Sequence, residues 1–268
     1  MEKLHSETES NIIAVTSGKG GVGKSIATVN IAEMLTYMGY SVAVIDADAG
    51  LSNSATLLNE NVSVTIDDWI TGDCYLEDLP HKFDAFTLVT ASNKPGMNNI
   101  EAVQFMSALD QVSKYLMTFN DFIFIDTPAG AGEITLWSLD QADVGLLILV
   151  NEPTAISDAY RLCKYIYSID PNYPFANIVN FSTNQKTATS THERFNNILN
   201  YFLNQKTEHF GYLPYSEEIK KLVSNQHTLL QQRTNLSELE KVFMRISQNI
   251  AGYFNKDYGQ KTKLKQLM

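Results

Sequence analysis

Runs of apolar residues alternate with amphipathic stretches along most of this chain. Several runs are apolar nearly throughout, which is typical of strands that are covered on both faces. They lie at residues 12–16, 41–45, 85–90, 122–125, 144–150, 176–181 and 209–213. Apolar positions at helical spacing predict helices near residues 24–38, 99–117, 132–141, 154–169, 188–205 and 237–254. The alternation predicts an α/β fold of three layers, with a doubly wound and mostly parallel sheet.

The length and composition of the chain fit one large domain. Its 268 residues with 44% hydrophobic content can bury a sizeable core. We expect that domain at residues 11–255, after a disordered polar segment at 1–10 and before a basic tail at 256–268. Segment 1–10 lacks the apolar stretch of a secretion signal, and no run is long enough to cross a membrane, so we expect a cytoplasmic protein. Cys74 and Cys163 are isolated, which predicts neither a disulfide nor a metal site.

A glycine-rich segment lies between the first predicted strand and the first predicted helix. Residues 17–25 read Ser-Gly-Lys-Gly-Gly-Val-Gly-Lys-Ser and match the phosphate-binding pattern G-x-x-x-x-G-K-S/T. Its glycines let backbone N–H groups turn toward phosphates, and the helix start favours anions. Lys24 is expected to contact the β- and γ-phosphates, and the Ser25 hydroxyl to bind Mg²⁺. The predicted nucleotide-binding residues here are Gly18, Lys19, Gly20, Gly21, Val22, Gly23, Lys24, Ser25 and Ile26.

Aspartates follow two of the predicted strands, where parallel sheets bind their ligands. Asp46 comes directly after strand 41–45, and Asp126 directly after strand 122–125. Both are candidates to hold Mg²⁺, Asp126 through a water molecule. Asp48 would lie nearer to the γ-phosphate and could orient the attacking water. A simpler interpretation stays open for each, because an aspartate after a strand often caps a helix or forms a turn.

Taken together, these motifs resemble the MinD/ParA family of deviant Walker-A ATPases, which have a P-loop NTPase fold of the SIMIBI class. The resemblance runs from about residue 11 to 250. It rests on Lys-Gly-Gly-Val-Gly-Lys-Ser at 19–25, Asp-x-Asp-x-Gly-Leu-x-Asn at 46–53, Asp-Thr-Pro-Ala-Gly at 126–130, Asn180, and Gly-Tyr-Leu-Pro-Tyr at 211–215. It implies that the chain binds and hydrolyses ATP with Mg²⁺, and that two copies dimerise face to face in the ATP state.

The resemblance also assigns roles to residues of this chain. Lys19, which ordinary nucleotide binding does not need, would contact the nucleotide of the other subunit and serve catalysis with Lys24 and Asp48. The metal residues would be Ser25, Asp46 and Asp126. Asn180 would read the adenine edge, and Pro214 would also belong to the nucleotide site. For Asn180, a strand-end amide that satisfies local backbone groups is the alternative.

One segment resembles a particular branch of the family. Residues 151–160, Asn-Glu-Pro-Thr-Ala-Ile-Ser-Asp-Ala-Tyr, are similar to a stretch of the FlhG-type ATPases, which control flagellar placement and number. Residues 67–73 look like the helix and turn that these proteins carry. The resemblance implies slow, partner-stimulated hydrolysis and a flagellar assembly or regulatory partner. Segment 151–160 is also simply a good helix start, because Pro153 suits a first turn. Segment 1–10 lacks the Asp-Gln-Ala-x-x-Leu-Arg motif with which FlhG-type chains stimulate a partner GTPase.

The sequence also allows a different function and a contact of the tail with a membrane. The alternative is a ParA-type DNA-segregation or other cargo-positioning ATPase, but the net charge of −10 and the scattered Arg161, Arg194, Arg233 and Arg245 make nucleic acid an unlikely partner. An iron–sulfur carrier would need cysteines that face a dimer partner. The basic tail 256–268 is either a frayed soluble end or a weak amphipathic contact with the inner face of the membrane.

Overall fold

The structure is a computed structural model. It describes residues 10–48, 53–59, 61–83, 86–92, 100–230 and 237–265, without the side chains of residues 53 and 256–265. The predicted disordered segment 1–10, apart from Ser10, therefore lies outside the described residues, as do residues 49–52 of the 46–53 motif. The side chains on which the predicted membrane contact of the tail depends also lie outside them.

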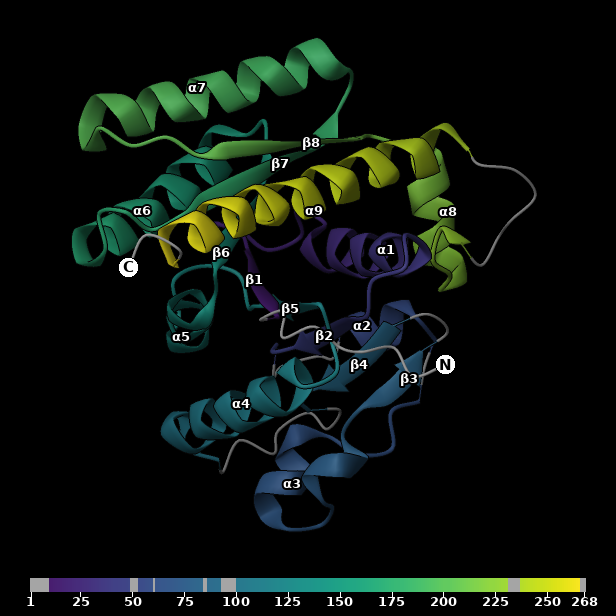
Figure 1. The fold of residues 1–268 in the computed structure, drawn as a ribbon. Helices are drawn as coiled ribbons and strands as arrows, with labels where there is room; N and C mark the ends of the chain where they lie inside the picture. The colour runs from purple at the N-terminus through teal and green to yellow at the C-terminus, as the bar shows by residue number, and fades with distance from the viewer. Residues whose placement is uncertain are drawn as a thin grey trace.

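The described strands form a single mixed sheet. They are β1 (Asn11–Thr16), β2 (Val42–Asp46), β3 (His81–Phe83), β4 (Phe86–Thr90), β5 (Phe122–Asp126), β6 (Val144–Val150), β7 (Phe175–Ser182) and β8 (Glu208–Pro214). Their order is β3-β4-β2-β5-β1-β6-β7-β8, and β3 alone among them runs antiparallel to its neighbour (Figure 1). The predicted α/β fold with a doubly wound, mostly parallel sheet is confirmed. The edge strand β3 was not predicted, because three residues are too few to show an alternating pattern.

The described helices cover both faces of this sheet. They are α1 (Lys24–Tyr37), α2 (Asn53–Leu57), α3 (Ile66–Thr71), α4 (Ala102–Met117), α5 (Glu133–Gln141), α6 (Pro153–Ile169), α7 (Gln185–Leu203), α8 (Glu217–Asn225) and α9 (Glu238–Lys265). The helix and turn expected at 67–73 is α3, which a Thr65–Asp68 capping box begins and Gly72 ends. Helix α8 was not predicted, although Ser216 caps it and two glutamates occupy its first turn.

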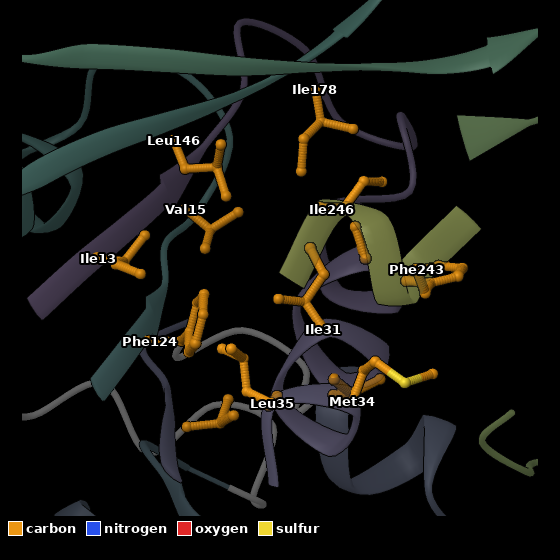
Figure 2. Close-up of a cluster of buried hydrophobic side chains, with 14 of the residues drawn as sticks. Ile13, Val15, Ile31, Met34, Leu35, Phe124, Leu146, Ile178, Phe243 and Ile246 are labelled. Carbon is orange, nitrogen blue, oxygen red and sulfur yellow. The ribbon is translucent and has the colours of Figure 1, made fainter. Parts of the chain in front are cut away.

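The side chains of β1 alternate between two hydrophobic layers. Ile13 and Val15 point into a cluster that α1 and α9 complete, as Figure 2 shows with Ile31 and Ile246. On the opposite face, side chains of the sheet pack against α6 and α7 in one cluster and against α3 and α4 in another. Helix, sheet and helix thus form the three layers that the sequence predicts, and every central strand is buried on both faces.

The start of the glycine-rich loop packs tightly against α6. A Cβ atom added to Gly18 would stand 2.4 Å from the backbone nitrogen of Ala159 and 2.8 Å from the Cβ of Asp158. Gly20, two residues further, would meet no atom within 4 Å. The first glycine of the loop is therefore required for a close approach of two backbones, and the second is not.

We predict that Gly18→Ala destabilises the protein by about 1–3 kcal/mol, because backbone atoms cannot yield as the tip of a side chain can. Gly20→Ala is the matched control and should unfold at or slightly above the wild-type temperature. Thermal unfolding without nucleotide measures both. Equal midpoints for the two variants would show that the loop does not depend on this contact.

Candidate functional site

The predicted site residues gather at the edge of the sheet where the parallel strands end. Asp46 of β2 and Asp126 of β5 are Cα partners in register, and Val15 of β1 is the partner of Asp126 on its other side. The glycine-rich loop begins two residues after Val15, so it runs beside both carboxylates. Strand pairing therefore brings residues that are distant in sequence to one place, as expected for sheets of this kind.

A cavity of about 380 Å³ opens at this edge. In its wall Gly21 and Gly23 have φ angles of 77° and 83°, which side chains rarely tolerate. Gly23 is also the N-cap of α1 and offers no side-chain cap, so first-turn N–H groups stay available to an anion. The lining residues are Ser17, Gly20, Gly21, Val22, Gly23, Lys24, Ser25, Ile26, Asp48, Leu57, Ala129 and Phe181.

Lys24 is held against the carboxylates beneath this cavity. Its Nζ lies 2.5 Å from Asp126 Oδ1, and the side chains are 10% and 1% exposed. Burial, and next the negative charge of Asp126, raise the pKa of Asp46 to about 7, although N–H groups of Ser54 and Asp48 and the charge of Lys24 act in the opposite direction. Two buried carboxylates thus share one lysine, which leaves a place for another positive charge.

The residues at this position fit a Mg²⁺ ion. Asp126 Oδ2 is buried and has no hydrogen-bond partner in the described structure, which is energetically unfavourable for a carboxylate oxygen. Asp46 supplies a second carboxylate beside Asp126, and Ser25 lines the cavity above them, although neither aspartate is itself among the lining residues. These are the oxygen donors that Mg²⁺ prefers. The chemistry of these three side chains is therefore compatible with Mg²⁺, and their role as metal residues stays a prediction.

Lys19 lies apart from this cluster. It is not among the residues that line the cavity, and its Nζ lies 2.9 Å from Glu152 Oε2, with side chains 48% and 55% exposed. Glu152 is the N-cap residue of α6 and belongs to the segment 151–160. Asp48, by contrast, lines the cavity and donates its backbone N–H to Asp46. Asp48 thus lies at the cavity of its own subunit, whereas Lys19 pairs with Glu152 and is not part of the cavity lining.

Asn180 and Pro214 lie at the ends of β7 and β8. Asn180 Nδ2 donates to the Val22 carbonyl at 2.7 Å, and its Oδ1 accepts from the Phe181 N–H at 2.8 Å. The bond with the Phe181 N–H is the local role that was the alternative for Asn180, and the bond with Val22 ties the side chain to the glycine-rich loop. Adenine reading stays a prediction. Pro214 is the Cα partner of Ser182 and is not among the residues that line the cavity. Its place in the nucleotide site also stays a prediction.

Sequence reasoning missed several residues of the site. Leu57 and Phe181 line the cavity, and Glu152 holds Lys19. Phe181 follows Asn180 directly, so its position after a strand was a signal, but a lone phenylalanine there is usually part of the core. Leu57 carries no local signal, and Glu152 lies in the segment 151–160 without any sign of its contact with Lys19, because only the folded chain brings these residues to the loop.

Comparison with known proteins agrees with this geometry. A ParA family model, described as NUBPL iron-transfer P-loop NTPase, matches residues 8–251. The antiactivator FleN of Pseudomonas aeruginosa is 30% identical over 234 residues, covering 85% of this chain and 82% of that protein. The flagellum site-determining protein YlxH of Helicobacter pylori is 29% identical over 223 residues, covering 81% and 74%. The resemblance to flagellar members of the family is therefore confirmed.

Solved structures show the same fold. A chain of the MinC:MinD cell division protein complex from Aquifex aeolicus matches with a TM-score of 0.71 at 22% identity, covering 91% of this chain and 96% of that one. The septum site-determining protein MinD of Pyrococcus horikoshii, complexed with Mg-ADP, matches with a TM-score of 0.72 at 20% identity, covering 90% and 96%. No helix in the described ranges is long and apolar enough to cross a membrane. From the family model, the relatives and the phosphate-binding loop, this chain belongs to the ParA/MinD family of P-loop NTPases.

Proposed function

We propose that this chain is a Mg²⁺-dependent ATPase that dimerises when it binds ATP, and that the dimer acts as a switch in the placement or number of flagella. The names of the relatives FleN and YlxH support the flagellar role. The observation that carries the switch is the separation of two lysines in one loop. Lys24 is buried and lines the cavity, whereas Lys19 is half-exposed and pairs with Glu152 outside the cavity lining.

The chemistry would be hydrolysis of ATP to ADP and phosphate. Water attacks the γ-phosphorus, and the bond to the bridging oxygen of the β-phosphate breaks. Lys24 would bind the β- and γ-phosphate oxygens, and Asp48 would orient the water. Ser25, Asp46 and Asp126 would hold Mg²⁺, which neutralises charge on the phosphates.

Lys19 would act on the nucleotide of the second copy. A cation supplied from outside a subunit can change phosphoryl-transfer rates by about 10³–10⁵. The ion pair with Glu152 is exposed and contributes only about 0–1 kcal/mol, so it can be exchanged at little cost for contact with a phosphate. A single protomer would then lack one catalytic charge, and dimerisation would supply it.

The described structure favours this function over two others. Arg161 pairs with Asp158, which offsets its charge, and Arg194 donates to Asn151; the net charge of −10 also disfavours DNA as a partner. An iron carrier would need cysteines that act together. Cys163 is buried among α6 and α7, whereas Cys74 packs near α3 in a different cluster.

The ATPase domain would span residues 11–255 and work in the cytoplasm. The backbone of the tail is helical up to Lys265, which suits a weak amphipathic contact of residues 256–268 with the inner face of the membrane. Dimerisation would strengthen such a contact, because two weak anchors then act together.

We predict that Lys19→Ala leaves ATP binding to the monomer within about threefold of wild type but weakens the ATP-state dimer about 10²- to 10⁴-fold. The physical reason is the loss of two charge-assisted contacts across the interface, one from each copy, each worth about 1.5–3 kcal/mol. Sedimentation velocity with a non-hydrolysable ATP analogue measures dimerisation, and calorimetry measures binding.

Lys82→Ala is the matched control, because Lys82 is exposed on the edge strand β3, far from the loop in the strand order. Glu152→Gln adds a second comparison, since it removes the ion pair and keeps Lys19; it should still dimerise. Normal dimerisation of Lys19→Ala would rule out the cross-subunit role.

We also predict that Asp48→Ala hydrolyses ATP about 10²–10⁴ times more slowly and accumulates as an ATP-bound dimer, because nothing orients the attacking water. Phosphate release and sedimentation measure the two effects. Asp110→Ala, on the outer surface of α4, should behave like the wild type. Rapid phosphate release by Asp48→Ala would remove Asp48 from catalysis.

A further inference from the structure

A polar cluster lies between α7 and the starts of β7 and β8, at the opposite end of these strands from the cavity. Two imidazole rings stack there, His192 of α7 and His209 of β8, with their centroids 4.5 Å apart. Asn177 of β7, which is completely buried, lies beside both rings. Its Oδ1 is 3.2 Å from His192 Nδ1 and 3.0 Å from His209 Nδ1. Two titratable rings therefore share one amide oxygen.

Thr207 and the Glu208 carbonyl fix the orientation of the Asn177 amide. Its Nδ2 donates to Thr207 Oγ1 at 2.6 Å and to the Glu208 carbonyl at 3.0 Å. Both amide hydrogens are then used, so Nδ2 has none left for His192 Nδ1, which lies 3.0 Å away. A flipped amide would set two carbonyl oxygens against each other. Oδ1 therefore faces the two rings and accepts, and each ring has to carry a hydrogen on Nδ1.

Asn196 closes the network on the other side of His192. The Thr207 N–H and hydroxyl both donate to Asn196 Oδ1 at 2.9 Å, which fixes this amide as well. Its Nδ2 donates to the Thr207 carbonyl at 3.0 Å and lies 3.2 Å from His192 Nε2. Nε2 therefore has to accept a hydrogen bond. With a hydrogen on Nδ1 and a lone pair on Nε2, His192 is neutral in this network.

A proton added to either ring would disrupt the cluster. On His192 it would set a ring N–H against the Asn196 N–H, and on His209 it would place a charge against the stacked ring. Burial lowers the pKa of His192, although the negative charges of Glu193 on α7 and Glu208 on β8 act in the opposite direction. Burial, and next the neighbouring His192, lower the pKa of His209 to about 4, although its hydrogen bond to the shared amide raises it. The folded cluster therefore disfavours proton uptake.

We propose that His192 and His209 form a proton-sensitive latch, which holds α7 on β7 and β8 at neutral pH and releases it in mild acid. A histidine in an unfolded segment has a pKa of about 6.5. Because the folded pKa values lie lower, the latch stabilises α7 fully above about pH 6.5, and this stability is lost as the pH falls toward the folded values. Phe195 and Leu199 pack α7 into a buried cluster without titrating, so acid would loosen the helix rather than remove it.

The same helix carries a contact that matters for the proposed function. Arg194, two residues after His192, donates to Asn151 Oδ1 at 2.7 Å. Asn151 directly precedes Glu152, which pairs with Lys19. Release of α7 would therefore disturb the segment that holds Lys19 in the proposed ATPase. The latch itself involves no nucleotide and would act whether or not the chain hydrolyses ATP.

Hydrogen exchange of the full-length protein tests the latch, measured without nucleotide at about pH 7.5 and about pH 5.5 and corrected for the intrinsic exchange rate. Below about pH 6.5, an opening that charges one or two histidines becomes about 10- or 100-fold more favourable per pH unit. We therefore expect the protection of α7 amides to fall about 10- to 100-fold more than that of α1, which the buried core holds. Equal loss in both helices would overturn the latch, because acid would then destabilise the whole domain. Unchanged protection of α7 would overturn it too.

A variant of one ring makes the result specific. His209→Asn offers the shared amide a side-chain N–H that does not titrate, so α7 should stay protected at neutral pH. Its acid-dependent loss of protection should be at least about threefold smaller than in wild type. His81→Asn is the matched control, on β3 at the opposite edge of the sheet, and should lose protection of α7 as the wild type does. A loss in His209→Asn as large as in wild type would refute the latch.

NMR of the wild-type protein tests the network without any substitution. The nitrogen chemical shifts of an imidazole ring report which of its two nitrogens carries a hydrogen. At neutral pH we expect His192 and His209 to be neutral, each with its hydrogen on Nδ1, because both rings donate to Asn177. A hydrogen on His192 Nε2, or a charged ring at neutral pH, would overturn the proposal.

Discussion

Asp46 and Asp126 lie in register at the ends of neighbouring strands, and both side chains are fully buried. Lys24 is the cation that the described structure places against Asp126. Removing one partner of such a buried pair generally costs about 3–5 kcal/mol, because an uncompensated charge remains. The pair therefore fixes the loop over the sheet edge. The negative charge of Asp46 is poorly compensated, which agrees with its raised pKa. Asp126 Oδ2 has no hydrogen-bond partner in the described structure. A divalent cation that also binds a polyphosphate would compensate the negative charges of these two carboxylates.

The two lysines of the loop differ chiefly in burial. Lys24 is almost completely enclosed and cannot move without leaving a buried charge behind, so it suits a permanent contact with the phosphates. Lys19 pairs with Glu152 in solvent, where an ion pair contributes little and is screened by salt. It can exchange partners easily, which is what an assembly switch requires. Gly18 keeps the loop close to α6 and thereby sets the distance between Lys19 and that helix.

Local and periodic features of the chain could be predicted from sequence, and features created by folding could not. The buried strands, the loop at 17–25 and the aspartates after β2 and β5 each carry a nearby signal, and the layers follow from the alternation. The irregular register between β7 and β8 arises only when the two strands pair, and the Lys19–Glu152 contact joins residues that only the fold brings together. Helix α8 had a capping signal, but its short apolar face was too weak to predict a helix.

The most direct test of this account is the affinity for ATP measured by calorimetry in the presence of Mg²⁺ and again with the metal chelated. The buried carboxylates are the reason why the site should require a divalent cation along with the nucleotide. We expect ATP to bind at least about tenfold more tightly with Mg²⁺, since the metal offsets charge repulsion between the phosphates and Asp46 and Asp126. Equal affinity with and without Mg²⁺ would contradict the assignment of these carboxylates to the metal.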